Sequence, residues 1–145
     1  MYHYTESGLN NVWLKNGYKI VTTPYGKGVA IENVEGLHRS IALQLINNKP
    51  RLSGAEFRFL RKELDMSQAT LAGIVGKDAQ SVARWEKKGQ TPKMADRMLR
   101  FVFQGYAGGD SKIKAIIERL NEIDQQAYAK MRFEKDGKDW KRLAA

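Results

Sequence analysis

Short runs of β-branched and aromatic residues alternate with polar residues near the N-terminus, at residues 12–14, 18–23 and 29–31. This alternation is typical of strands that bury one face. Asn16-Gly17 lies between the first two runs, and this dipeptide tolerates the positive φ that a type I′ hairpin turn requires. A lone hairpin is only marginally stable. We therefore predict a three-stranded β-meander.

The hydrophobic period changes from two to about four after residue 33. Leu37, Ile41 and Leu45 recur at the spacing of one helical face, which predicts an amphipathic helix over residues 34–47. Residues 1–50 are thus expected to form a module that consists of the small β-meander and this helix.

The C-terminal part of the chain has a second stripe of this kind. After a glycine-containing turn, an apolar residue at every third or fourth position predicts an amphipathic helix over residues 110–133, with Asp110 or Ser111 as its cap. Residues 134–145 are polar and are expected to form a solvated tail, in which Trp140 is a candidate anchor.

Cap signals divide the central block, residues 53–107, into helices. Ser53 followed by Glu56 forms a capping box. A short helix is predicted after Ser67, and Gly76 ends it in the left-handed conformation. Asp78 caps the next helix only two residues later. Two short helices joined by a glycine-containing turn are typical of the helix-turn-helix motif.

The second helix of this pair has an outward face suited to reading DNA. Gln80, Ser81 and Arg84 are predicted to point outward, and these residue types can contact adenine, thymine and guanine edges in the major groove. Val82 and Trp85 are predicted to point inward. The flanking lysines are candidates for phosphate contact, although a merely solvated face is the alternative: Lys77, Lys87, Lys88 and Lys93.

The residues of these two helices resemble the Xre/Cro-repressor helix-turn-helix family. The resemblance covers residues 53–107 and rests on two runs, Met66-Ser67-Gln68-Ala69-Thr70-Leu71-Ala72-Gly73-Ile74-Val75-Gly76 and Ser81-Val82-Ala83-Arg84-Trp85-Glu86-Lys87-Lys88-Gly89-Gln90-Thr91-Pro92. It implies that the 53–107 block is a lambda-repressor-like five-helix domain. Together with the N-terminal β-meander, this predicts an α+β, mainly α protein. The Phe57–Lys62 opening is most similar to antitoxin regulators of the MqsA type. This chain lacks the cysteines of their zinc-binding module, so no zinc site is carried over.

The resemblance also implies roles for particular residues. Gln68 would contact phosphate, and Arg61 and Glu86 would form a structural ion pair. The base-contacting set would be Ala79, Gln80, Ser81 and Arg84. A homodimer would place two recognition helices about 34 Å apart, which is one turn of DNA.

The composition of the chain excludes several classes of function. The net charge of +9 favours a polyanionic partner, and it is spread along the whole chain. There is no cysteine, which excludes disulfides and cysteine-ligated zinc. We find no catalytic constellation and no metal-ligand spacing, and we expect no enzyme activity and no cofactor. No apolar run suits a signal peptide or a membrane span, so we expect a cytoplasmic protein.

The sequence therefore predicts a dimeric transcriptional regulator, most simply a repressor, that binds a palindromic operator in double-stranded DNA. The alternative is an antitoxin that also binds a toxin or another protein through its N-terminal module or its C-terminal helix. Trp13 and Tyr25 are the exposed apolar residues where such a contact is expected.

Overall fold

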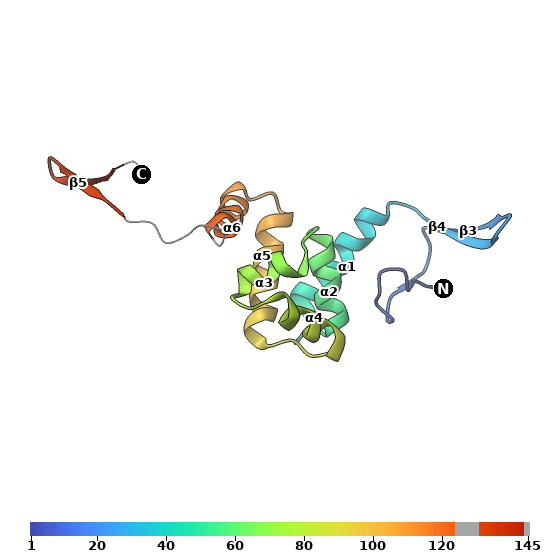
Figure 1. Ribbon diagram of the computed structural model, residues 1–145. Coiled ribbons are helices and arrows are strands. Elements are labelled where there is room, and N and C mark those ends of the chain that lie inside the picture. The colour runs from blue at the N-terminus through green and yellow to red at the C-terminus, as the bar shows by residue number, and fades with distance from the viewer. Residues whose placement is uncertain (124–130, 144–145) are drawn as a thin grey trace.

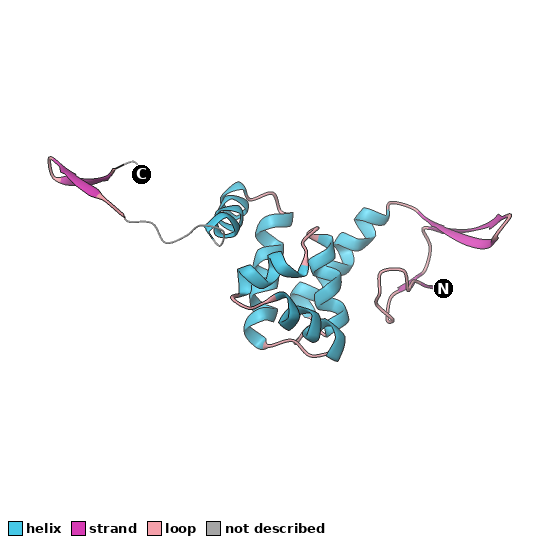
Figure 2. Cartoon of the chain, in the orientation of Figure 1, coloured by secondary structure: helices cyan, strands magenta, loops and turns pink. Residues whose placement is uncertain are grey.

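A computed structural model describes residues 1–123 and 131–143 of the chain. Helices dominate the α+β fold: the described residues contain six helices and three antiparallel strand pairs. Figure 1 shows the helices gathered into one body, and Figure 2 shows the strands lying outside it.

The N-terminal strands form two separate pairs, so the predicted three-stranded meander was wrong. Strand β1 (Tyr2–His3) pairs with β2 (Trp13–Leu14), and β3 (Tyr18–Thr23) pairs with β4 (Gly26–Ile31). Strand β2 pairs with the N-terminal residues Tyr2 and His3 in place of β3. The His3 ring stacks on Trp13 with centroids 4.1 Å apart. A two-residue strand leaves no periodic signal in the sequence, so this pairing was missed.

Helix α1 (Val34–Asn48) lies where the sequence predicts it. Its buried residues are Ala42, Leu45 and Ile46. Leu45 and Ile46 belong to the core cluster that also contains residues of α2, so α1 joins the N-terminal segment to the helical body.

Four helices follow between residues 54 and 107: α2 (Gly54–Glu63), α3 (Gln68–Val75), α4 (Ala79–Lys88) and α5 (Lys93–Ala107). The expectation of five helices within 53–107 was therefore wrong. A further helix, α6 (Ser111–Ile123), packs against α3 and α5. The core has fully buried side chains from each of the helices α2 to α5 and from the segment before α2: Leu52, Phe57, Leu60, Leu71, Val82 and Leu99.

Helix α6 begins at the predicted place. The Asp110 carboxylate accepts hydrogen bonds from the backbone N–H groups of Lys112 and Ile113, at 3.0 and 3.2 Å. Ile113 approaches Gly105 of α5 so closely that a β-carbon there would lie 2.7 Å from the Ile113 side chain. The predicted extension of this helix through residue 133 was wrong at its end, because a strand begins at Phe133. Residues 124–130 of that prediction lie outside the described residues.

The predicted polar tail contains a hairpin. Strand β5 (Phe133–Asp136) pairs with β6 (Asp139–Arg142). Gly137 opens the two-residue turn with φ of +64°, the conformation that type II′ turns require at this position. The turn and the cross-strand pairs explain why these polar residues form strands, and the hairpin stands apart from the helices (Figure 1).

Candidate nucleic-acid interface

Local caps set the bounds of α3 and α4. The Ser67 hydroxyl accepts a hydrogen bond from the Thr70 N–H at 3.0 Å, and the Asp78 carboxylate accepts one from the Ser81 N–H at 2.8 Å. Between them Gly76 ends α3 with φ of +73°. Helices α3 and α4 therefore begin and end as the sequence predicts, and they pack directly against each other.

An open groove of about 720 Å³ lies beside the outward face of α4. The residues that line it come from α4 and the loops on either side: Lys77, Ser81, Arg84, Trp85, Lys88, Gln90 and Pro92. Three of these carry a positive charge and none carries a negative charge. Because three cations and no carboxylate line the groove, it suits a polyanion, although the Asp78 carboxylate lies near enough for its charge to interact with Arg84.

An ion pair attaches α4 to α2 on the inner side. The Arg61 guanidinium donates to both carboxylate oxygens of Glu86, from Nε at 2.8 Å and from Nη2 at 3.0 Å. Both side chains are almost fully buried, at 9% and 5% exposed. Arg61 also donates to the Met66 carbonyl, and Gln68 donates to Glu86 at 3.2 Å. The expected Arg61–Glu86 pair is thus present, and it fixes the side chain of Gln68 as well.

Close backbone approach holds the same end of α4. A β-carbon at Gly54 would lie 2.5 Å from the carbonyl oxygens of Trp85 and Glu86. The Trp85 ring meets Phe57 edge-on, with centroids 6.1 Å apart. The first turn of α2 therefore touches the backbone of α4, which leaves α4 little room to shift.

A buried carboxylate ties the next helix to the segments before α2. Asp96 is fully buried and accepts hydrogen bonds from the Leu52 N–H at 2.7 Å and from Arg97 and Arg100. Burial opposes its ionisation, but the hydrogen bonds from Arg100 and Leu52 and the charge of Arg100 outweigh burial. The pKa of Asp96 therefore lies below its ordinary value. Arg100 also donates to the Ile46 carbonyl at the end of α1.

The two helix N-termini differ in their attraction for phosphate. At α4 the hydrogen bond from the Ser81 N–H lowers the pKa of Asp78, so this cap is anionic at neutral pH. A carboxylate at this position offsets the positive end of the helix dipole. At α3 the cap is the neutral Ser67, which leaves the helix end available to an anion.

The predicted contact residues are only partly brought together. Ser81, Arg84, Lys77 and Lys88 line the groove. Gln80 is exposed near the start of α4, whereas Ala79 is half-buried. The remaining lysines, Lys87 and Lys93, are exposed but do not line the groove, and Gln68 is half-buried beside Glu86.

Sequence reasoning missed two features of this region. Gln90 and Pro92 line the groove from the loop after α4, and only the exposed loop that follows Gly89 could have indicated them. The second feature is a chain of hydrogen bonds that attaches the N-terminal segment to the helices: the Tyr4 hydroxyl lies 2.6 Å from Nε2 of His38, and Nδ1 of His38 lies 2.8 Å from Glu63. These residues are too far apart in sequence to show a pattern.

The chain matches no protein-family model, no curated protein and no solved structure. Among residues 1–123 and 131–143, no group of three or more histidine, aspartate or glutamate side chains is placed to hold a metal ion. Within the same residues, no helix has the length and apolar character needed to cross a bilayer.

Proposed function

We propose that this protein is a sequence-specific, DNA-binding transcriptional regulator of the Xre/Cro type, and that α4 is its recognition helix. The observation that carries the proposal is the groove beside α4, which is lined by Lys77, Arg84 and Lys88 and by no acidic residue. The family resemblance implies that Ala79, Gln80, Ser81 and Arg84 of this helix contact bases, and two of these residues, Ser81 and Arg84, line the groove.

The polar residues of the groove divide into two roles. Ser81 lies in the first turn of α4 and Arg84 one turn further along the same side, where a helix in the major groove meets base edges. Lys88 lies at the end of α4 and Lys77 precedes it, so both suit the phosphates on either side of the groove. In this proposal the protein occludes the promoter as a repressor and performs no chemistry.

Binding of a palindromic operator would require two copies. Helix α5 offers an apolar surface for this, since Phe101 is 60% exposed and Met94 is 72% exposed. Val102, the neighbour of Phe101, is buried in the core and is not available for such a contact. We place the dimer contact at the exposed side of α5.

The proposal is tested by selecting bound sequences from a random duplex pool at about 150 mM salt, where non-specific binding is weak. A palindrome with half-sites one helical turn apart would support it. Arg84→Ala should change the preferred bases and cost about 1–3 kcal/mol on the selected site. Lys88→Ala should weaken all duplexes alike and lower the salt slope by about 0.9.

Arg39→Ala, which removes an exposed charge from α1, is the matched control and should leave both the preference and the slope unchanged. If no sequence is enriched by the wild type, or if Arg84→Ala keeps the wild-type preference, α4 does not read bases and the proposal fails.

One observation favours antitoxin activity as a second function. The N-terminal segment and α1 enclose an apolar groove of about 340 Å³, lined by Leu9, Val12, Trp13, Leu37 and Ile41 among others. Trp13 remains 57% exposed there, and a single apolar segment of a partner protein would cover it. Co-purification of a partner that is lost in Trp13→Ser would support this function.

A further inference from the structure

The C-terminal hairpin has an aromatic and cationic face that the helix-turn-helix proposal does not explain. Phe133 pairs with Arg142, and Lys135 pairs with Trp140. Cross-strand partners share a face, as do residues two apart on one strand. The four side chains therefore lie together. Both aromatic side chains are exposed to solvent, Phe133 by 54% and Trp140 by 70%.

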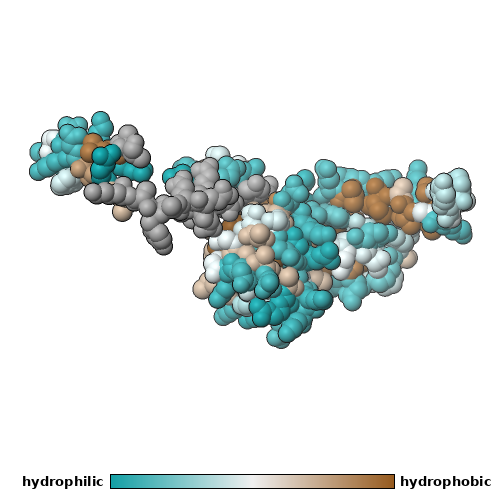
Figure 3. Space-filling model, viewed as in Figure 1, coloured by the Kyte–Doolittle hydropathy of each residue, from teal (hydrophilic) through white to brown (hydrophobic). Residues whose placement is uncertain are grey.

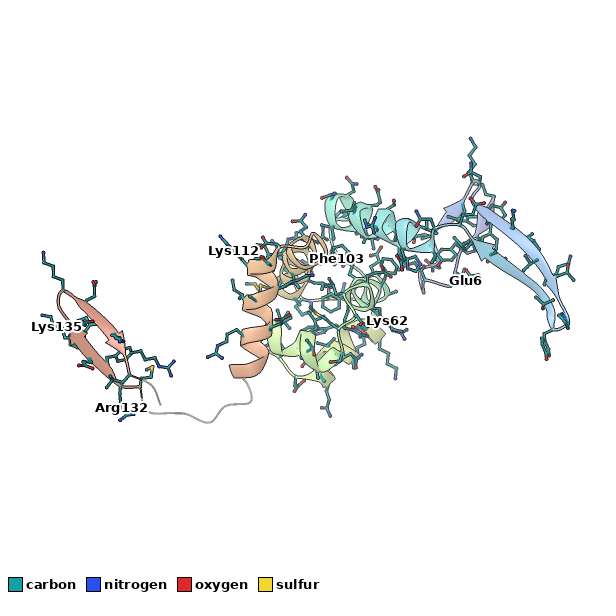
Figure 4. The ribbon with its side chains drawn as sticks, turned by 90° about the horizontal axis from the view of Figure 1, so that it is seen from above. Glu6, Lys62, Phe103, Lys112, Arg132 and Lys135 are labelled. Carbon is teal, nitrogen blue, oxygen red and sulfur yellow. The ribbon has the colours of Figure 1, made fainter. Side chains whose placement is uncertain are left out.

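The opposite face of the hairpin has the reverse charge. There Glu134 pairs with Lys141, and Asp136 pairs with Asp139. This face contains three carboxylates and one lysine, whereas the aromatic face contains two cations and no carboxylate. The two faces of the hairpin therefore differ in charge: the aromatic face is cationic and the opposite face is mainly anionic. Figure 4 shows the hairpin with Lys135 labelled.

The stability of the hairpin alone does not explain why the cations and aromatic rings share one face. Opposite charges across a strand pair stabilise a hairpin, and Glu134 with Lys141 already supplies such a pair on the other face. The aromatic face excludes carboxylates and leaves its rings in water. Figure 3 shows a small apolar patch on this hairpin among hydrophilic residues. Such a combination fits a ligand that is both anionic and able to cover apolar rings.

We propose that the face formed by Phe133, Lys135, Trp140 and Arg142 is a second DNA-contacting surface of this protein. Lys135 and Arg142 bind phosphates, and the two rings pack against deoxyribose and base edges. A two-stranded ribbon has the width that the major groove of duplex DNA admits. The choice of duplex DNA as the polyanion rests on the proposed function. Because α4 and the hairpin belong to one chain, contact by one raises the effective concentration of the other at the same duplex.

The experiment titrates the full chain into a labelled mixed-sequence duplex of about three helical turns. Fluorescence anisotropy is followed from about 50 to 200 mM salt. Lys135→Gln should lower the salt slope by about 0.9 and weaken binding about eightfold near 0.1 M salt, because one counterion-releasing contact is lost. Lys141→Gln is the matched control: it removes the same charge from the opposite face of the same hairpin. It should keep the wild-type slope.

Equal losses in both variants would show a general effect of net charge and would overturn the inference, as would no loss in either. Lys135→Arg keeps the charge and should keep the slope, which separates a lost contact from a damaged hairpin. A second readout uses 5-fluorotryptophan and ¹⁹F resonances, with Trp140→Phe to assign the signal. The Trp140 resonance should shift when the duplex is added, and an unshifted resonance in a bound complex would refute the contact.

The two proposals can fail separately. The double variant Arg84→Ala/Lys88→Ala tests α4 on the same duplex. If it loses affinity while the Lys135 variant does not, the inference about the hairpin is wrong and the proposed function stands. If only the Lys135 variant loses affinity, the hairpin contact stands and the assignment of α4 is wrong.

Discussion

Removal of the Glu86 carboxylate tests how α4 is held in place. Glu86→Leu leaves the Arg61 guanidinium buried, with its side chain 9% exposed, and takes away both carboxylate hydrogen bonds. The Met66 carbonyl still accepts from Arg61, but it carries no charge. Leaving one partner of a buried pair alone costs about 3–5 kcal/mol. The free energy of unfolding of a small domain is about 5–15 kcal/mol, so this cost is a large share of the total stability.

The double variant Arg61→Met/Glu86→Leu removes both charges and so distinguishes the loss of the whole ion pair from the loss of one partner. Apolar residues of similar volume often replace a buried ion pair at little cost, since no charge is then stranded. The double variant should therefore be more stable than Glu86→Leu alone, by about 2 kcal/mol or more. Urea unfolding followed by far-UV circular dichroism measures all four proteins of the cycle. Lys87→Leu, at an exposed position on the same helix, is the control and should change stability by less than about 0.5 kcal/mol.

Two results would refute this reasoning. If Glu86→Leu costs less than about 1 kcal/mol, the buried guanidinium is not stranded by the loss. If the cost of the double variant equals the sum of the single costs, the two side chains do not act as a pair.

Two further predictions concern the packing of the helical body. Gly54→Ala should destabilise the protein by about 1–3 kcal/mol in urea unfolding, because the new β-carbon meets the backbone carbonyls of Trp85 and Glu86; an unchanged midpoint would contradict the close approach. Asp96 has a lowered pKa when folded, so its stabilisation is present above about pH 3.9, its unfolded pKa, and is lost as pH falls through the folded value. The stability difference between wild type and Asp96→Asn should therefore shrink as urea unfolding is repeated from about pH 5 toward pH 2, and a difference that stays constant with pH would rule this out.

Local signals were sufficient for much of the helical part. The caps at Ser53, Ser67 and Asp78 are side-chain hydrogen bonds to backbone N–H groups three residues away. Such a bond depends on the residues that form it and their neighbours, so it can be predicted from a window of sequence. The hydrophobic period likewise predicted α1 to within a residue. The start of α6 was predicted for the same reason, with Asp110 or Ser111 as its cap, and Asp110 is the residue that accepts the capping hydrogen bonds.

Contacts between segments that are distant in the sequence could not be predicted from such local signals. The pairing of β1 with β2, in place of a meander, depends on two N-terminal residues with no periodicity. The link from Tyr4 through His38 to Glu63 joins the loop after β1 to α1 and α2. The Arg61–Glu86 pair joins residues 25 apart and was expected only because of the family resemblance.

Some features of the candidate DNA surface therefore follow from the sequence, and others depend on the tertiary structure. Its residue types and their place on one helix follow from the sequence, because the helical repeat alone puts Ser81, Arg84 and Lys88 on one side of α4. That Gln90 and Pro92 complete the groove, and that Gln68 is fixed by Glu86, was decided by tertiary structure. The physical reason is one of range: caps and helical faces are set by neighbours in the chain, whereas grooves and buried pairs depend on how separate helices pack.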